Sequence, residues 1–232
     1  MRPAWFFRLS VLALLNAPPV LAQAEFVALP TPPGASSAHV SGISGNGRVI
    51  VGLASTTQVG EAVRWEDRAP VALGHLPGGG VSSGAWATDL DGDVVVGDSD
   101  SARFVCESFL WTAAQGMVSL GALQGSTGNT AFDVSLDGLV VVGTSRNAVA
   151  PLSVPYRWTA GARMVPLGLL GERAGARATN ADGSVVVGSY FVGNNPFPFR
   201  WTSATGMVPL GFGGSAEDVS ADGNVVVGDE TA

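Results

Sequence analysis

The sequence contains no lysine: all 12 basic residues among its 232 are arginine, and the formal net charge is −7. The absence of lysine excludes a Walker-type phosphate lysine and a Schiff-base lysine. The single cysteine, Cys106, excludes an internal disulfide and a cysteine-rich zinc site. An acidic chain without clustered basic charge is a poor binder of nucleic acid, because phosphate neutralisation needs such a cluster. We therefore expect no nucleic-acid partner and no bound cofactor.

Long apolar runs are also scarce, and the first 24 residues have the pattern of a secretory signal peptide. Arg2 and Arg8 form a positive start, Leu9 to Leu15 form an apolar stretch, and Ala22-Gln23-Ala24 is a small-x-small cleavage site. The alternative is an anchoring transmembrane helix, but Pro18 and Pro19 end the apolar run well short of the ~20 residues that a span needs. We predict a signal peptide over residues 1–24 and a mature chain over residues 25–232 without a transmembrane segment. The expected location is secreted, periplasmic or at the cell surface.

Three short motifs recur along the mature chain with one shared period. The first is a valine run closed by glycine, as in DVSLDGLVVVG, TNADGSVVVG and DVSADGNVVVG. The second ends on tryptophan, as in FRW, and the third ends on Leu-Gly, as in MVPLG. The closing glycines of the first motif are Gly52, Gly97, Gly143, Gly188 and Gly228, with spacings of 45, 46, 45 and 40 residues. A period of 40–50 residues indicates a propeller or a repeat array.

Each repeat predicts four short strands, which we name a to d. Strand a precedes an Asp-Gly or Asn-Gly pair, strand b is the valine run, strand c ends on the tryptophan, and strand d ends on Leu-Gly. Asp-Gly and Asn-Gly are typical hairpin turns, since glycine adopts a positive φ without steric cost. A polar side chain two positions earlier can hydrogen-bond the turn backbone. These polar residues are Ser44, Asp89, Ser135, Asn180 and Ser220.

The valine runs are apolar on both faces, which predicts strands that are buried on both sides. We therefore predict an all-β fold: a β-propeller-like array of four-stranded repeats of about 45 residues, with four full units and a partial fifth. The alternatives are a solenoid of stacked hairpins and a β-sandwich. No segment shows a sustained 3.6-residue apolar period, so almost no helix is expected after the signal peptide.

Closure of the array depends on its two ends. Phe26 to Leu29 matches strand d, and the last repeat contains only strands a and b. Together they would form one composite blade without strand c, in a ring of about five blades. Pairing of Phe26 to Leu29 with the strand that ends at Gly228 would show such closure. Without it, exposed blade edges predict aggregation or a longer parent protein.

These motifs resemble those of the bacterial extracellular repeat proteins called the HAF family. The closest unit is DVSADGNVVVG together with FRWTSATGMVPLG, and the resemblance covers nearly all of the mature chain. It implies secretion or surface display, a propeller-like fold and no established activity. Such repeats often resemble passengers of an autotransporter barrel or of a C-terminal sorting signal, and neither pattern follows Ala232 here.

Candidate catalytic residues are few. Gly80 to Gly84 matches G-x-S-x-G, but a nucleophile elbow needs a strand before it and a helix after it, and this segment joins strand d to strand a. His39 and His75 have no matching acid and nucleophile. We therefore assign no catalytic or cofactor-binding residue and expect no enzyme.

Alternating carboxylates are the best candidate for a metal site. Asp89, Asp91 and Asp93 form D-x-D-G-D, with Asp98 and Asp100 close by, and several carboxylate oxygens suit calcium. The turn chemistry explains the same aspartates in the other repeats, so we assign no metal ligand.

We expect Cys106 to be a free cysteine before strand c. We expect the recurrent tryptophans to pack the blades, and Arg64, Arg157 and Arg200 to point to the opposite side of their strands.

The b–c and d–a connections differ from repeat to repeat, whereas the turns between a and b are constant. In an up-and-down blade the two variable connections lie at the same end, and such an end commonly carries binding function. Tyr190, Phe191, Asn194 and Asn195 could stack on and hydrogen-bond a sugar or a peptide. The ligand itself is unknown from the sequence.

The leading hypothesis is a non-catalytic binding or adhesion module for an extracellular glycan or a protein. The alternatives are a structural passenger of a longer surface protein and a glycan-active enzyme on a propeller scaffold.

Overall fold

The computed structural model describes residues 26–57, 59–211 and 213–230, and the predicted signal peptide lies outside this range. Eighteen strands make up the regular structure of the described residues. No helix that could span a bilayer is found among them. The predicted all-β composition is therefore confirmed.

The strands form four antiparallel groups of four strands, called blades 1 to 4, and one antiparallel pair, called blade 5. A single parallel bridge between Ser153 and Arg173 joins blades 3 and 4 into one eight-stranded sheet. Blade 1 contains β1 (Ser37–Ile43), β2 (Val49–Ser55), β3 (Gly60–Glu66) and β4 (Ala69–Ala72). Blade 2 contains β5 (Ser83–Thr88), β6 (Val95–Ser99), β7 (Glu107–Thr112) and β8 (Gly116–Ser119). Blade 3 contains β9 (Ser126–Val134), β10 (Val140–Asn147), β11 (Ser153–Thr159) and β12 (Arg163–Pro166). Blade 4 contains β13 (Arg173–Thr179), β14 (Val185–Val192), β15 (Asn195–Thr202) and β16 (Gly206–Pro209), and blade 5 contains β17 (Gly214–Val219) and β18 (Val226–Glu230).

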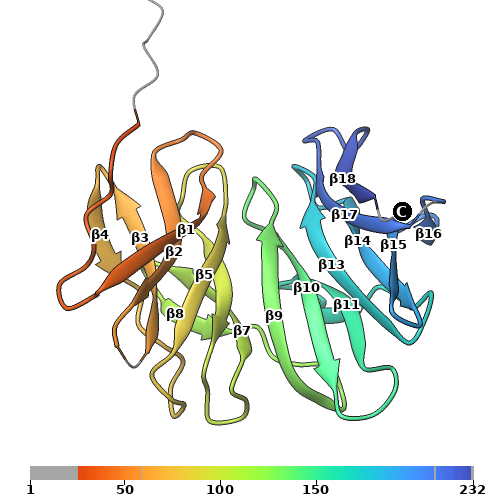
Figure 1. Cartoon of the computed structure of the whole chain (residues 1–232), viewed down its shortest axis with the longest axis horizontal. Coiled ribbons are helices and arrows are strands. Elements are labelled where there is room, and N and C mark those ends of the chain that lie inside the picture. Colours follow the sequence, from red (N-terminus) through yellow and green to blue (C-terminus); the bar gives the residue numbers. More distant parts are fainter. Residues whose placement is uncertain (1–25, 58, 212, 231–232) are drawn as a thin grey trace, which may run out of the picture.

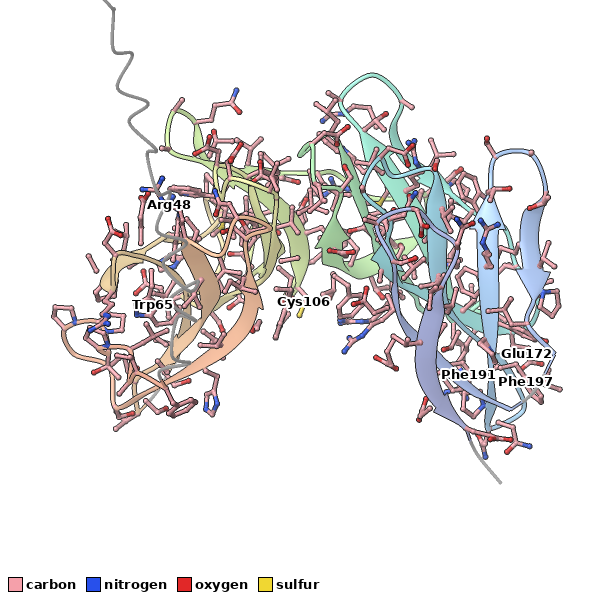
Figure 2. All side chains as sticks on the ribbon, turned by 90° about the horizontal axis from the view of Figure 1, so that it is seen from above. Arg48, Trp65, Cys106, Glu172, Phe191 and Phe197 are labelled. Atoms are coloured by element: carbon pink, nitrogen blue, oxygen red, sulfur yellow. The ribbon has the colours of Figure 1, made fainter. Side chains whose placement is uncertain are left out.

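Within each blade the strands follow the predicted order a, b, c and d. The turns between a and b lie along the top of Figure 1, and the b–c loops lie along the bottom. Seen from above, the blades are arranged side by side in an open arc, with blades 1 and 5 at its two ends (Figure 2). The innermost strands β1, β5, β9, β13 and β17 contribute residues to one shared channel.

The a–b turns confirm the predicted turn chemistry. In blade 3 the buried Ser135 hydroxyl accepts a hydrogen bond of 3.0 Å from the Val140 N–H, and Gly138 has a φ of +72°. The equivalent acceptors in the other blades are Ser44, Asp89, Asn180 and Ser220. The side chain two positions before the Asp or Asn therefore closes every turn.

Successive blades are held together by the valines of strand b. In blade 3, Val140 packs on the turn glycine Gly183 of blade 4, where a Cβ would overlap it. Val142 lies in one buried cluster with Ala176 and Val186 of blade 4. The valines that occupy the same two positions in the other complete blades are Val49 and Val51, Val94 and Val96, and Val185 and Val187. The two-faced apolar character of the valine runs thus reflects contact with the next blade.

Polar contacts repeat at the same joints. The N–H of Leu136 in the blade 3 turn donates to the carbonyl of Ala181 in blade 4 at 3.0 Å, and the N–H of Ala181 donates to Ala221 in blade 5 at 3.2 Å. The side chain of Arg157 reaches from strand c to the carbonyl of Gly183 at 3.0 Å. Arg64 and Arg200 make the same kind of contact to the next blade. The strand-c arginines therefore join neighbouring blades.

The two ends of the chain do not form the composite blade. Among the described residues β18 pairs with β17 alone, and Phe26 to Leu29 is not a strand. Instead, Leu29 packs on Val63 and Trp65 of blade 1, and the Trp65 indole donates to the carbonyl of Pro30 at 2.8 Å. Leu29 thus takes the place that Leu73, the strand-d leucine of blade 1, takes beside blade 2.

The glycine that closes each valine run is required by a close backbone approach. At Gly143 a Cβ would overlap the carbonyl oxygen of Thr130 in the adjacent strand a. The closing glycines of all other blades meet a strand-a carbonyl in the same way: Gly52, Gly97, Gly188 and Gly228.

We expect Gly143→Ala to lower the free energy of unfolding by about 3 kcal/mol, because the methyl group must displace a backbone carbonyl in a packed blade. Urea denaturation followed by circular dichroism would measure it. Gly161→Ala is the matched control, since a Cβ there meets nothing within 4 Å. Equal effects of the two substitutions would contradict the proposed role of Gly143.

Candidate binding site

Every innermost strand carries one β-bulge at the same position. In β5, Ala85 pairs with Gly97 and Ala87 pairs with Val96, so Trp86 between them has no partner on β6. A bulge of this kind re-aims a side chain and often lies next to a functional site. The bulged residues of blades 1 to 5 are Ser41, Trp86, Phe132, Arg177 and Glu217.

These five residues, which we call the bulge ring, line one cavity of roughly 600 Å³ in the channel of the arc. A volume in this range suits a small ligand or a short segment of a larger one. The chain thus brings together two aromatic side chains, one cation, one anion and one hydroxyl from five different blades. Their neighbours on strand a are mostly small or buried, so the bulge ring supplies most of the chemistry of the cavity.

Contacts within the bulge ring hold three of its members. Arg177 forms a salt bridge of 2.9 Å with Glu217, and both side chains are about half exposed, at 52% and 49%. The guanidinium of Arg177 also lies over the ring of Phe132, 5.3 Å from its centroid. An exposed ion pair contributes little to stability, so its polar atoms can exchange partners at low cost.

Trp86 is held by the blade behind it. Its indole N–H donates to the carboxylate of Asp98 on β6. Burial raises the pKa of Asp98, although the hydrogen bonds from Trp86 and Cys106 and the charge of Arg146 oppose this. The side chain of Trp86 is half-buried, so part of its ring faces the channel.

Asp133 follows the bulge in β9 and joins blade 3 to blade 4. Its carboxylate accepts the N–H of Val134 in its own strand and the N–H of Thr179 in β13, both at 2.8 Å. Enclosure between the strands raises the pKa of Asp133 to about 7, with the nearby charge of Asp218 acting in the same direction and the two backbone hydrogen bonds opposing it. Asp133 is therefore a group that changes its charge near neutral pH.

The residues proposed for the variable end are divided over two faces of one hairpin. Tyr190 on β14 stacks on its partner Phe197 on β15, with ring centroids 5.6 Å apart. Phe191 lies under the guanidinium of Arg173 at 4.7 Å on the other face, while Asn194 is exposed at the turn. Asn195 begins β15 and is also exposed. Figure 2 shows Phe191 and Phe197 near one end of the arc, away from Cys106.

The variable loops themselves lie at one end, as predicted. The N–H of Leu76 in the β4–β5 loop donates at 3.0 Å to the hydroxyl of Ser99, the last residue of β6 before the β6–β7 loop. The N–H of Asp100 in turn donates to the carbonyl of Ser82 at 2.9 Å.

The G-x-S-x-G segment lacks the context of a nucleophile elbow. Strand β5 begins at Ser83 and no helix follows. The serine at the nucleophile position, Ser82, lies in the β4–β5 loop, and its carbonyl accepts the N–H of Asp100 at 2.9 Å. The hydroxyl of the next serine, Ser83, accepts from Ala62 at 2.9 Å and donates to Gly74 at 2.7 Å. His39 and His75 are both exposed, in β1 and in the β4–β5 loop.

The aspartates of the D-x-D-G-D segment serve different partners. The buried Asp89 carboxylate accepts the N–H groups of Gly92 and Val94, and burial raises its pKa in spite of these bonds. Asp98 lies with Trp86 instead. In the part of the chain that the structure describes, no three His, Cys, Asp or Glu side chains are placed to hold a metal ion.

Cys106 is a free cysteine directly before β7, as predicted. Burial and, to a lesser degree, the charge of Asp98 raise the pKa of the Cys106 thiol, while Arg146 lowers it. A raised pKa reduces the thiolate fraction at neutral pH, so Cys106 is a poor nucleophile.

The bulge ring is the feature that sequence reasoning missed. A signal existed: three positions before the turn residue Ser, Asp or Asn, the repeats carry Ser, Trp, Phe, Arg and Glu, whereas the neighbouring positions carry mostly small residues. When one strand position carries a different residue type in each repeat, packing between the blades does not determine the side chain at that position. The bulge that turns this position toward the channel is visible only in the pairing of the strands.

No family model matches the chain, and no curated protein matches it either. Among solved structures, TolB from Acinetobacter baumannii is similar over 78% of this chain and 45% of its own, with 16% identity and a TM-score of 0.57. A putative TolB from Agrobacterium tumefaciens is similar over 87% of this chain and 78% of its own, with 16% identity and a TM-score of 0.60. The chain therefore spans less than half the length of the Acinetobacter protein. The likeness supports the predicted propeller-like fold.

The raised pKa of Asp133 predicts that stability falls as pH rises. The unfolded carboxyl loses its proton near pH 3.8 and the folded one near 7, so the folded chain binds the extra proton between these values. The free energy of unfolding should therefore fall by up to about 1.4 kcal/mol per pH unit in this window and level off above it. Denaturation midpoints between pH 4 and 8 would show the slope.

Asp133→Asn should remove this component of the slope, although Asp89 and Asp98 still contribute in the same direction. Asp222→Asn is the control, because hydrogen bonding to Ser220 lowers the pKa of Asp222 and its titration lies below the window. A slope that Asp133→Asn leaves unchanged would refute the assignment.

Proposed function

We propose that this chain is an exported, non-catalytic binding module that holds an extracellular glycan or protein ligand in the channel, at the bulge ring. The arrangement that carries the proposal is the bulge ring itself: five blades of constant framework each direct a different side chain into one cavity. The signal-peptide pattern and the resemblance of the repeats to the HAF family support export and surface display.

The chemistry of the cavity suits a ligand with both flat apolar and polar groups. Phe132 and Trp86 offer ring faces for stacking. Arg177 and Glu217 offer a planar donor and a planar acceptor, both half exposed, which match hydroxyl or amide groups. Sugar rings and exposed peptide loops carry these groups, whereas a nucleic acid would need more cations than one.

The variable end offers a second binding surface, and variants can distinguish the two. We expect combined replacement of Phe132, Arg177 and Glu217 by alanine to reduce binding at least tenfold. The three side chains face the channel, and each hydrogen bond to a charged group contributes about 1.5–3 kcal/mol. Binding would be measured on a glycan array and in a cell-surface adhesion assay.

The matched control replaces Phe191, Asn194 and Asn195 by alanine at the β14–β15 hairpin. Circular dichroism should show that both triple variants fold, since none of the six side chains is fully buried. Loss of binding in the hairpin variant alone would place the ligand at the variable end and refute the channel site. Unchanged binding in both would leave the structural passenger as the better account.

A glycan-active enzyme is the second candidate, on one observation. Asp133 and Asp218 line the same small cavity at the turn end of the channel, and Asp133 has a pKa of about 7, as a general acid requires. Both oxygens of Asp133 accept backbone N–H groups, which favours a structural role for this carboxylate. We expect no release of product from chromogenic glycosides. Activity that Asp133→Asn abolishes would replace the binding module by the enzyme.

A further inference from the structure

Each contact between neighbouring blades has two sides: the strand-b valines of one blade, and the turn and strand a of the next blade. At the two ends of the arc, one side of such a contact lies exposed without the other. At blade 5, Val225 and Val227 occupy the positions of Val140 and Val142. The latter are buried at 4% and 0% exposure against blade 4, whereas Val225 and Val227 are 58% and 55% exposed. We call this surface of blade 5 the donor face.

Blade 1 carries the other half, which we call the acceptor face. Val40 stands where blades 2 to 5 have a fully buried alanine, and it is 59% exposed, while Ile43 is 60% exposed. The turn glycine Gly47 meets nothing within 4 Å, although its equivalents in the other four blades each touch a valine of the preceding blade. A groove of roughly 880 Å³ lies here, between strand β1 and the N-terminal segment.

The two faces repeat the two halves of the internal joint, with Val40 in the place of the buried alanine. Among the described residues blade 5 consists of strands a and b, and Leu29 already fills the place of a strand-d leucine beside Trp65 on the acceptor face. An incoming pair of a and b strands would therefore complete the joint. In the internal joints Val140 packs on Gly183 and Val142 near Ala176, so Val225 would pack on Gly47 and Val227 on Val40.

Polar groups fit in the same register. Asp133 accepts the N–H of Thr179 in the next blade, and Asp218 and Ile43 are the equivalents of this pair. Exposed carboxylates of opposite sign to two arginines of the acceptor face lie at the end of blade 5: Asp229 and Glu230 are in β18, whereas Arg48 and Arg68, together with Asp67, line the groove of the acceptor face. Arg48 is labelled in Figure 2 at the blade 1 end of the arc.

We propose that the donor face of one copy of this chain binds the acceptor face of a second copy, head to tail, through a joint of the same design as those inside the arc. The occupant is a second copy because blade 1 is the surface of this chain that repeats the required pattern, and within one chain the two faces lie at opposite ends of the arc (Figure 2). A heterologous contact of this kind leaves one free face of each type on every assembly, so it continues until a ring closes.

Two variants that each destroy one face test the proposal by complementation. Val227→Arg removes the donor face and Val40→Arg removes the acceptor face, and both side chains are more than half exposed, so the variants should fold. The mass of each species would be measured by light scattering after size-exclusion chromatography over a range of concentrations. We expect the wild-type mass to rise with concentration and each variant to keep the mass of one chain.

An equal mixture of the two variants should form a species of two chains and nothing larger, because only one intact donor face and one intact acceptor face can meet. The dissociation constant of wild-type contacts should rise roughly tenfold or more with either substitution. Val118→Arg, at an exposed valine of β8, is the control and should assemble like the wild type.

Three results would overturn the proposal. Wild-type protein with the mass of one chain at every concentration would show that the faces close within the chain or do not associate. Assembly of the single variants would place the contact elsewhere, and a mixture that grows beyond two chains would show non-specific association. None of these results concerns the bulge ring, so the proposed ligand site is tested independently by the binding assays.

Discussion

The packing of strand-b valines on the turn glycine and strand-a alanine of the next blade is the contact on which the whole arc depends. It explains why blades 2 to 5 keep a glycine in the turn and an alanine in strand a, since these positions touch the valines of the preceding blade. Burial of apolar area at these joints is the main stabilising contribution that a chain without disulfides has. The low share of charged residues follows in part, because both faces of strand b are covered in the complete blades.

A second constraint links this framework to the candidate site. The glycine that closes each valine run lets the carbonyl of strand a approach strand b, and the bulge lies directly beside this approach. The bulge removes one residue per blade from the ladder and turns it to the channel. The framework residues are thereby fixed by packing, while the bulged residue is free to differ from blade to blade. Rigid positioning and chemical variety thus come from the same local distortion.

Much of the fold could be predicted from the sequence because each repeat carries the same local patterns for its strands and turns. The period, the order of strands, the turn residues and the free Cys106 are each tied to a local pattern, and the structure confirms them. Closure of a composite blade was the expectation that the structure does not bear out. Phe26 to Leu29 does resemble strand d, and Leu29 does take the position of a strand-d leucine, but without a strand c beside it the segment has no partner for a backbone ladder.

The candidate site was harder to predict for a physical reason. Loop length and loop variety drew attention to Tyr190 and Phe191, yet neighbouring residues of a strand point to opposite faces, so they do not form one surface. A bulge interrupts this alternation, and nothing in the local composition of Phe132 or Arg177 announces it. Sites built from one residue of each repeat become visible only when the repeats are placed around a common axis.

The hydrogen bonds between successive turns all run the same way, from the N–H of one blade to the carbonyl of the next. The arc therefore has a direction: its blade 1 end and its blade 5 end present different backbone groups. Anchoring such a molecule at one terminus would leave a chemically different surface at its free tip. A layer built from it would have an inside and an outside without any further orienting component.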